Sequence, residues 1–459
     1  MAQKPSIPKG TRDFAPSEIA KRNYIFDTIK RNFQTYGFQP IETPSFENSE
    51  TLLGKYGEEG DRLIFKILNS GDFISKVDDK TYSDKNSNSL APKITEKALR
   101  YDLTVPFARY VVMHQNELDF PFKRYQIQPV WRADRPQKGR FREFFQCDAD
   151  VVGSDSLLQE VELIQLYDGV FSDLKLEGAT IKMNNRKILA GIAEVIGAKH
   201  LLIDFTVALD KLDKIGEEGV KKEMLAKGIS AEAIEKAAPL FEPQGSNVDQ
   251  LNRLDNLLKD SEEGQKGLEE LRFIMETIST LGLQSAKLAI DVTLARGLNY
   301  YTGAIFEVSA PKGVSMGSIG GGGRYDDLTG IFGLKDVSGV GISFGLDRIY
   351  LVLEELNLFP EAVDKSLDVL CLNFGIKEAL ASLKLVTELR KRGIMSDLYP
   401  SDVKIQKQFK YANNRKVPYV ILLGAEELEN NSFVVKYMES GDQITYALSE
   451  VDKFVSTLN

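Results

Sequence analysis

Residues 130–150, VWRADRPQKGRFREFFQCDAD, hold four arginines and one lysine among aromatic, strand-forming residues. Polar and apolar residues alternate in YQIQPVW (125–131) and again in FREFFQCDADVV (141–152), as they do in β-strands. The segment between them carries Pro136 and Gly139, which favour a loop. The stretch therefore predicts an antiparallel hairpin with a basic loop at its tip.

Two interpretations of this hairpin remain open from the segment alone. In the first, Arg132 and Phe144 share one face, where an arginine forks onto a phosphate and a ring stacks under a base. Asp134 would then accept from an adenine amino group, and Gln146 and Asp150 would share the face of Phe144 by the period of two. In the second, the charges form a cross-strand salt-bridge lattice on an exposed sheet.

Composition limits the classes of function. With 459 residues, 42% hydrophobic and 27% charged, the chain is expected to be a globular protein of about two to four domains. It has no apolar run of 18 residues, and its start, MAQKPSIPKGTRDF, lacks the apolar core of a signal peptide, so a cytoplasmic protein without membrane contact is expected. The net charge of −9 argues against indiscriminate nucleic-acid binding, and the two distant cysteines predict neither a disulfide framework nor a zinc site.

The common nucleotide-binding motifs are missing. There is no GxxxxGK[ST] sequence, and SIGGGGRYDDL (318–328) does not have the spacing of GxGxxG, so its glycines predict close backbone packing or a tight turn. Arg348 is expected at a junction between a strand and a helix. Arg296 lies between apolar and aromatic neighbours, where a cation needs an anionic partner from the protein or from a ligand.

The pattern changes along the chain. Residues 69–93 are polar and weakly patterned, which predicts a long hairpin loop or an inserted segment. Residues 186–283 are helical in pattern and highly charged, whereas after about residue 366 strands and helices alternate, as in a separate α/β domain. Within it, residues 390–416 carry eight basic and two acidic residues around Phe409 and Tyr411, which is typical either of a solvated helix face or of a surface that meets RNA.

Five stretches taken together resemble one enzyme family. In chain order they are TPSFENSETL, VWRADRPQKGRFREFFQ, LARGLNYYTGAIFE, SIGGGGRYDDL and GVGISFGLDRIYLVL. This ordered set is similar to the three signature motifs of class II aminoacyl-tRNA synthetases and to two stretches peculiar to histidyl-tRNA synthetases. The resemblance implies an α/β protein whose catalytic domain, residues 1–360, has a mainly antiparallel sheet, flanking helices and a helical insertion at about 210–275. It also implies an anticodon-binding domain with a mixed sheet at residues 366–459.

The resemblance also implies roles for single residues. For ATP, Arg132 would hold the α-phosphate, Asp134 would read the adenine amino group, Phe144 would stack on the base, and Arg348 would lie on the side of the adenine and γ-phosphate. Arg296 would neutralise the substrate carboxylate and the α-phosphate, so Arg296 and Arg132 are the expected catalytic residues. Contacts to the α-amino group of histidine are implied for Asp102, Thr104 and Gln146, and contacts to its imidazole for Asp150 and Tyr301.

The implied reaction is activation of histidine by ATP, then transfer to the 3′-terminal adenosine of histidine tRNA by a cytoplasmic homodimer. ATP would be a substrate, and Mg²⁺ would come with its phosphates instead of occupying an all-protein site. Two other functions remain to be compared with this one. A regulatory paralogue would bind histidine without charging tRNA, but it typically lacks the last domain and parts of the ATP motifs. A synthetase for another amino acid would lack the two histidine-specific stretches.

Overall fold

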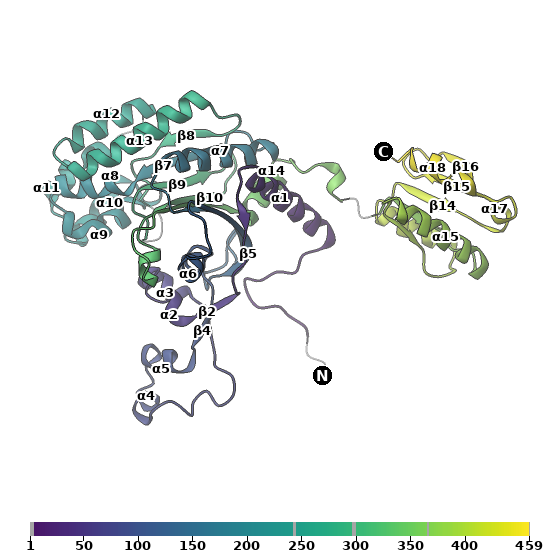
Figure 1. Cartoon of the computed structure of the whole chain (residues 1–459), viewed down its shortest axis with the longest axis horizontal. Coiled ribbons are helices and arrows are strands. Elements are labelled where there is room, and N and C mark those ends of the chain that lie inside the picture. Colours follow the sequence, from purple (N-terminus) through teal and green to yellow (C-terminus); the bar gives the residue numbers. More distant parts are fainter. Residues whose placement is uncertain (1–3, 242–244, 296–299, 365–366, 459) are drawn as a thin grey trace. The chain divides into compact units, whose positions relative to one another are not determined.

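The computed structural model describes residues 4–241, 245–295, 300–364 and 367–458. The chain divides into two compact units, Met1–Phe359 and Pro360–Asn459 (Figure 1). Each unit has hydrophobic clusters of its own, so each is described by itself. Within the described ranges, no helix is both long and apolar enough to span a membrane.

An eight-stranded sheet organises the first unit. Its outermost pairs, β1 with β5 and β7 with β8, are parallel, whereas the neighbours between them are antiparallel. The predicted mainly antiparallel sheet is thus confirmed, as is the hairpin, in which Val130 pairs with Phe144. The order is β1 (Gln39–Pro40), β5 (Phe122–Trp131), β6 (Glu143–Val152), β11 (Gly339–Gly345), β10 (Gly320–Tyr325), β9 (Ala304–Ser309), β7 (Thr180–Asn185) and β8 (Lys287–Ile290).

Strand β6 separates the main core from the site. Cys147, Ala149 and Val151 are buried in the largest hydrophobic cluster, among residues of α1 (Pro16–Thr35) and α7 (Leu158–Asp173). Because successive side chains of a strand point to opposite faces, the alternate residues of β6 face away from this cluster. The ring of Phe33 from α1 packs against that of Phe344 on β11, with centroids 5.8 Å apart, so the helices cover the core face.

The opposite face of the sheet carries a second hydrophobic cluster. Helix α6 (Thr104–His114) lies against the concave side of the sheet (Figure 1), and its Phe107 and Val111 pack with Val152 and Tyr325. Short elements extend this cluster: α2 (Ser49–Leu52), α3 (Gly57–Leu63) and an antiparallel sheet of β2 (Phe46–Asn48), β4 (Lys97–Leu99) and β3 (Lys66–Ile67).

Residues 69–93, predicted as a long hairpin loop or an inserted segment, join two antiparallel strands but are not without helices. This connection between β3 and β4 contains α4 (Asp79–Ser83) and α5 (Ser87–Ile94). Each helix begins after a capping side chain: the carboxylate of Asp78 accepts from the backbone N–H of Thr81, and the side chain of Asn86 accepts from that of Asn88. Such polar residues are common in loops, but they also satisfy the free N–H groups of a first helical turn.

A helical segment connects β7 to β8. It gathers at one side of the first unit (Figure 1) and holds α8 (Arg186–Val195), α9 (Leu202–Leu209), α10 (Leu212–Ala226), α11 (Ala231–Lys236), α12 (Asn247–Leu258) and α13 (Glu262–Leu281). Glycines 191 and 264 allow α8 and α13 to approach closely, because an added Cβ at Gly191 would lie 2.5 Å from the Cα of Gly264. Helix α14 (Leu346–Glu355) ends the main part of the unit.

The second unit has the predicted mixed sheet. Strand β12 pairs in parallel with β13 and β14, while β15 is antiparallel to both of its neighbours. The strands are β13 (Ser396–Leu398), β12 (Val369–Cys371), β14 (Tyr419–Leu422), β15 (Ser432–Tyr437) and β16 (Gln443–Ala447). The helices are α15 (Ile376–Lys391), α16 (Ile405–Asn414), α17 (Ala425–Glu429) and α18 (Val451–Val455).

Candidate active site

One cavity brings together most of the residues predicted from the sequence. It has a volume of about 360 Å³ and opens over β6, β10 and β11. Arg296, the remaining predicted site residue, lies outside the described residues. The predicted residues that line the cavity are Asp102, Thr104, Arg132, Asp134, Phe144, Gln146, Asp150, Tyr301 and Arg348.

Arg132 follows β5 directly and forms no ion pair among the described residues. Its Nε donates to the carbonyl oxygen of Tyr101 at 3.0 Å, and its guanidinium carbon lies 4.2 Å from the centroid of the Tyr101 ring. The ring of Phe144 lies on the same side, 5.3 Å away, as the period of two predicts. A carbonyl and two rings position a cation but do not cancel its charge, so this part of the cavity suits an anion.

Arg348, in the first turn of α14, connects the hairpin loop to the glycine-rich strand. Its Nε donates to the carbonyl oxygen of Gly139 at 3.1 Å, and its Nη1 donates to that of Ser318. Gly139 has φ of +70°, and an added Cβ there would lie 3.1 Å from the Arg348 side chain. Asp134 forms a long ion pair with Arg140, 3.8 Å between Oδ1 and Nη1, on the same loop.

Asp102 also lines the cavity and is almost fully buried, and it lies close enough to Arg132 for that charge to act on its carboxyl. Its Oδ1 accepts from the hydroxyl of Tyr56 at 2.8 Å and from the backbone N–H of Val105 at 3.2 Å, while Oδ2 accepts from the hydroxyl of Tyr300 at 3.4 Å. Burial raises the pKa of the Asp102 carboxyl, and these hydrogen bonds and the charge of Arg132 oppose the rise. No local pattern predicts Tyr56, whose contact with Asp102 spans 46 positions of the chain.

Asp150 is held by two groups that the sequence patterns did not predict, Arg124 and Tyr325. Its Oδ2 forms an ion pair with Nη2 of the fully buried Arg124 at 2.8 Å, and its Oδ1 accepts from the hydroxyl of Tyr325 at 2.6 Å. Arg124 was findable, because it stands directly opposite Asp150 in the predicted hairpin. Tyr325 was not, since its contact depends on how β10 reaches β6 through the intervening β11.

The glycines of 318–328 form a strand, so close packing is the correct one of the two predicted explanations. An added Cβ at Gly322 of β10 would lie 2.1 Å from the carbonyl oxygen of Gly341 on β11. Gly341 in turn pairs with Asp150, and an added Cβ there would lie 2.0 Å from Oδ1 of Asp150. The backbone therefore approaches the Asp150 carboxylate at a distance that no side chain would allow.

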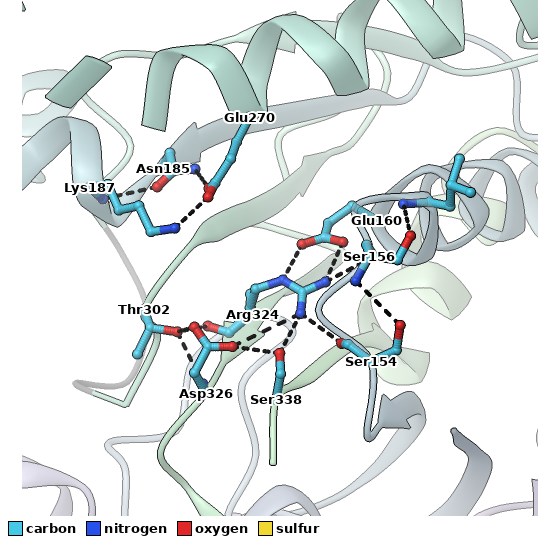
Figure 2. Close-up of polar contacts among 11 residues, drawn as sticks. Ser154, Ser156, Glu160, Asn185, Lys187, Glu270, Thr302, Arg324, Asp326 and Ser338 are labelled. Atoms are coloured by element: carbon cyan, nitrogen blue, oxygen red, sulfur yellow. Dashed lines mark hydrogen bonds and ion pairs between the residues drawn. The ribbon is translucent and has the colours of Figure 1, made fainter. Parts of the chain in front are cut away.

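A buried ion pair anchors β10 from behind the cavity. Figure 2 shows the guanidinium of Arg324 facing both carboxylate oxygens of Glu160, in the first turn of α7, with N···O distances of 2.5 and 2.6 Å. Its Nη1 also donates to the hydroxyl of Ser338 and to the carbonyl oxygen of Ser154. Arg324 immediately precedes Tyr325, so this network fixes the strand that presents Tyr325 to Asp150.

Comparison with protein families gives two matches that follow each other along the chain. Residues 92–349 match the model described as histidyl-tRNA synthetase. Residues 368–458 match the model described as anticodon binding domain.

Similar proteins match over nearly their whole length. The histidine–tRNA ligase of Christiangramia forsetii is 68% identical over 96% of this chain and 97% of its own, and that of Flavobacterium johnsoniae is 65% identical over 97% and 98%. The crystal structure of histidyl-tRNA synthetase from Nostoc sp. superposes with a TM-score of 0.81 at 30% identity, covering 99% of this chain and 100% of that one. An ATP phosphoribosyltransferase regulatory subunit/histidyl-tRNA synthetase from Bacillus halodurans shares the fold, with a TM-score of 0.73 at 21% identity over 92% of this chain and 100% of its own.

Proposed function

The chain belongs to the histidyl-tRNA synthetase family, so its activity is the ligation of histidine to tRNA, and we propose which residues perform it. The supporting observation is one cavity that is lined both by the cation Arg132 and by the buried carboxylates Asp102 and Asp150. ATP phosphates fit the cation, and the donor groups of histidine fit the carboxylates. The activity needs both in one enclosure.

In the first step, a carboxylate oxygen of histidine bonds to the α-phosphorus of ATP. The bond from that phosphorus to the bridging oxygen breaks, and pyrophosphate leaves with the electron pair. Arg132 and Arg296 reduce the repulsion between the two anions and stabilise the charge of the transition state. Arg348 holds the γ-phosphate side, Phe144 stacks on adenine and Asp134 accepts from its amino group. Mg²⁺ enters with the ATP phosphates, which are its preferred ligands.

The carboxylates and amide of the cavity select histidine. Asp102, Thr104 and Gln146 receive the α-ammonium group, and Asp150 and Tyr301 contact the imidazole. Gln146 supports this assignment because its buried Oε1 has no hydrogen-bond partner among the described residues. Sites built to pair buried polar groups reject analogues that lack them by about 10⁴-fold or more.

In the second step, a ribose hydroxyl of the terminal adenosine of tRNA attacks the activated carbonyl carbon and AMP leaves. The second unit, matched as an anticodon binding domain, would meet the anticodon. In its basic segment, 390–416, Tyr411 is 36% exposed and available for stacking, whereas Phe409 packs into a hydrophobic cluster. We further propose that the enzyme acts as a cytoplasmic homodimer.

The assay that tests the proposal is ATP–pyrophosphate exchange without tRNA, run separately with each amino acid. Exchange is expected with histidine alone. Histidine binding without exchange would instead support the regulatory paralogue and refute the catalytic roles. Exchange with a different amino acid would leave the ATP residues standing and refute the assignments at Asp102 and Asp150.

Gly341→Ala is expected to weaken the binding of histidine without affecting the binding of ATP. The added methyl group would overlap the Asp150 carboxylate and displace it from Tyr325 and Arg124. We expect the KM for histidine to rise by about tenfold or more, the effect of losing a charged hydrogen-bond partner. Gly330→Ala is the matched control, because an added Cβ there meets nothing within 4 Å. Equal KM values for histidine in the two variants would show that Asp150 does not contact the substrate.

A further inference from the structure

Asp148 is a second carboxylate on the cavity face of β6, and the roles proposed above leave it unused. It lies between Gln146 and Asp150 in the alternation of the strand, lines the cavity and is 2% exposed. Its Oδ1 is buried and has no hydrogen-bond partner in the described part of the chain. Ser343, opposite on β11, hydrogen-bonds the carboxylate and accepts from Nε2 of Gln146 at 3.3 Å.

The neighbouring Asp150 differs in that a cation lies against it, although its Oδ2 likewise accepts no hydrogen bond among the described residues. Tyr325 donates to its Oδ1 and Arg124 is paired with its Oδ2. Of the two carboxylates at this point of the cavity, Asp148 is thus the one whose unpartnered oxygen also has no ion pair among the described residues. A buried acceptor without a donor is costly, and a ligand that supplies an N–H relieves the cost.

The surroundings of Asp148 shift the pKa of its carboxyl and contain mostly acceptor groups. Burial raises its pKa to about 7; Arg124 lowers it and the charge of Asp150 raises it further. The titratable groups that interact with it are Arg124 on β5, Cys147 and Asp150 on β6, Asp102 before α6, Tyr167 on α7 and Tyr301 before β9. Only one of these, Arg124, is a cation, so an incoming N–H donor meets an excess of acceptors.

We propose that Asp148 is a further specificity-determining residue, whose Oδ1 accepts a hydrogen bond from a ring N–H of the substrate's imidazole. The inference rests on the proposed function, since it concerns the same substrate in the same cavity. Asp150, braced by Tyr325 and Arg124, keeps the contact with the imidazole proposed above. Asp148 supplies the acceptor that distinguishes imidazole from rings of equal size without an N–H.

The test compares histidine with β-(4-thiazolyl)alanine, which has a similar ring but no ring N–H. Apparent KM for histidine, KM for ATP and the inhibition constant of the analogue are measured by pyrophosphate exchange in the wild type and in Asp148→Asn. The assay is run at a pH above the Asp148 pKa of about 7, where the carboxylate is ionised. Asparagine keeps the shape and loses the charge, so the KM for histidine should rise about tenfold, the difference between a charged and a neutral acceptor. The inhibition constant of the analogue and the KM for ATP should change less than about threefold, because neither molecule uses the N–H contact.

If the binding of histidine and of the analogue weakens in parallel, or if neither changes, the role of Asp148 is overturned while the proposed function stands. No histidine exchange in the wild type would overturn the function, and the inference with it. Asp148→Ala, which leaves no acceptor, is the second variant and should show the same selective loss to a greater degree.

Thermal unfolding against pH checks that the asparagine variant folds. The folded protein holds a proton on Asp148 up to about pH 7, whereas the unfolded chain releases it near the ordinary value of 3.8, so Asp148 lowers wild-type stability as pH rises between these values. Asp148→Asn removes this slope, so the variant is expected to unfold at a higher temperature than the wild type at pH 7.5. A thermal midpoint of the variant below that of the wild type would show that the ionised carboxylate stabilises the fold. That result would contradict the proposal that its free oxygen serves the substrate.

Discussion

Replacing Arg132 by alanine is expected to reduce histidine-dependent pyrophosphate exchange by about 10²–10³-fold, as the loss of one preorganised transition-state donor does in other enzymes. The residue suits this role because its described contacts, the Tyr101 carbonyl and the Tyr101 and Phe144 rings, orient its guanidinium without an ion pair. The loss should fall on kcat more than on the KM for histidine, since the charge that Arg132 meets develops during the attack on phosphorus.

Arg135→Ala is the matched control for this prediction. Arg135 stands in the same hairpin loop and carries the same charge, but it is exposed and does not line the cavity. Exchange without tRNA should therefore stay near the wild-type rate. If both variants lose activity equally, the effect would belong to the general positive charge of the loop, and the position assigned to Arg132 would be wrong.

Replacing Arg324 by alanine is expected to lower the free energy of unfolding of the first unit by about 3–5 kcal/mol. The substitution leaves Glu160, whose side chain is 0% exposed, as a buried carboxylate without its cation. It also removes the donors to Ser154 and Ser338 shown in Figure 2. Because the same strand carries Tyr325, the KM for histidine should rise in whatever fraction stays folded.

Denaturant unfolding followed by tryptophan fluorescence measures this change in the relevant unit. Trp131 is the single tryptophan of the chain, and its indole donates to Glu143 across the β5–β6 hairpin. Arg31→Ala serves for comparison, since its ion pair with Asp173 is largely exposed and should contribute less than about 1 kcal/mol. Similar unfolding midpoints for the two variants would mean that Glu160 is not stabilised through Arg324.

The sequence was sufficient where local patterns decide the structure. Alternation and the Pro136–Gly139 loop predict the hairpin, and the period of two predicts that Arg132 and Phe144 share a side. By the same period Asp148 shares the face of Gln146 and Asp150, and it lines the cavity. The motif resemblance, however, implies roles only for Gln146 and Asp150.

The features that the sequence did not predict have two causes. Some depend on contacts between distant segments, and others on side chains that favour two local structures equally. Tyr56 and Tyr325 reach the carboxylates from segments 46 and 175 positions away, and no periodicity reports such distances. Helices α4 and α5 were missed for a different reason. The Asp and Asn side chains that cap them favour turns equally well, so local composition does not decide between the two.

Substitutions on the two faces of β6 are expected to have different consequences. A substitution at Cys147, Ala149 or Val151 alters a packed interior, so its effect should be on how much folded enzyme a cell retains. A substitution on the other face should instead alter which amino acid the folded enzyme accepts. A deletion of one codon does both at once, because a shift of one residue turns carboxylates into the interior and aliphatic side chains into the pocket. This strand is therefore expected to vary by replacement but not in length.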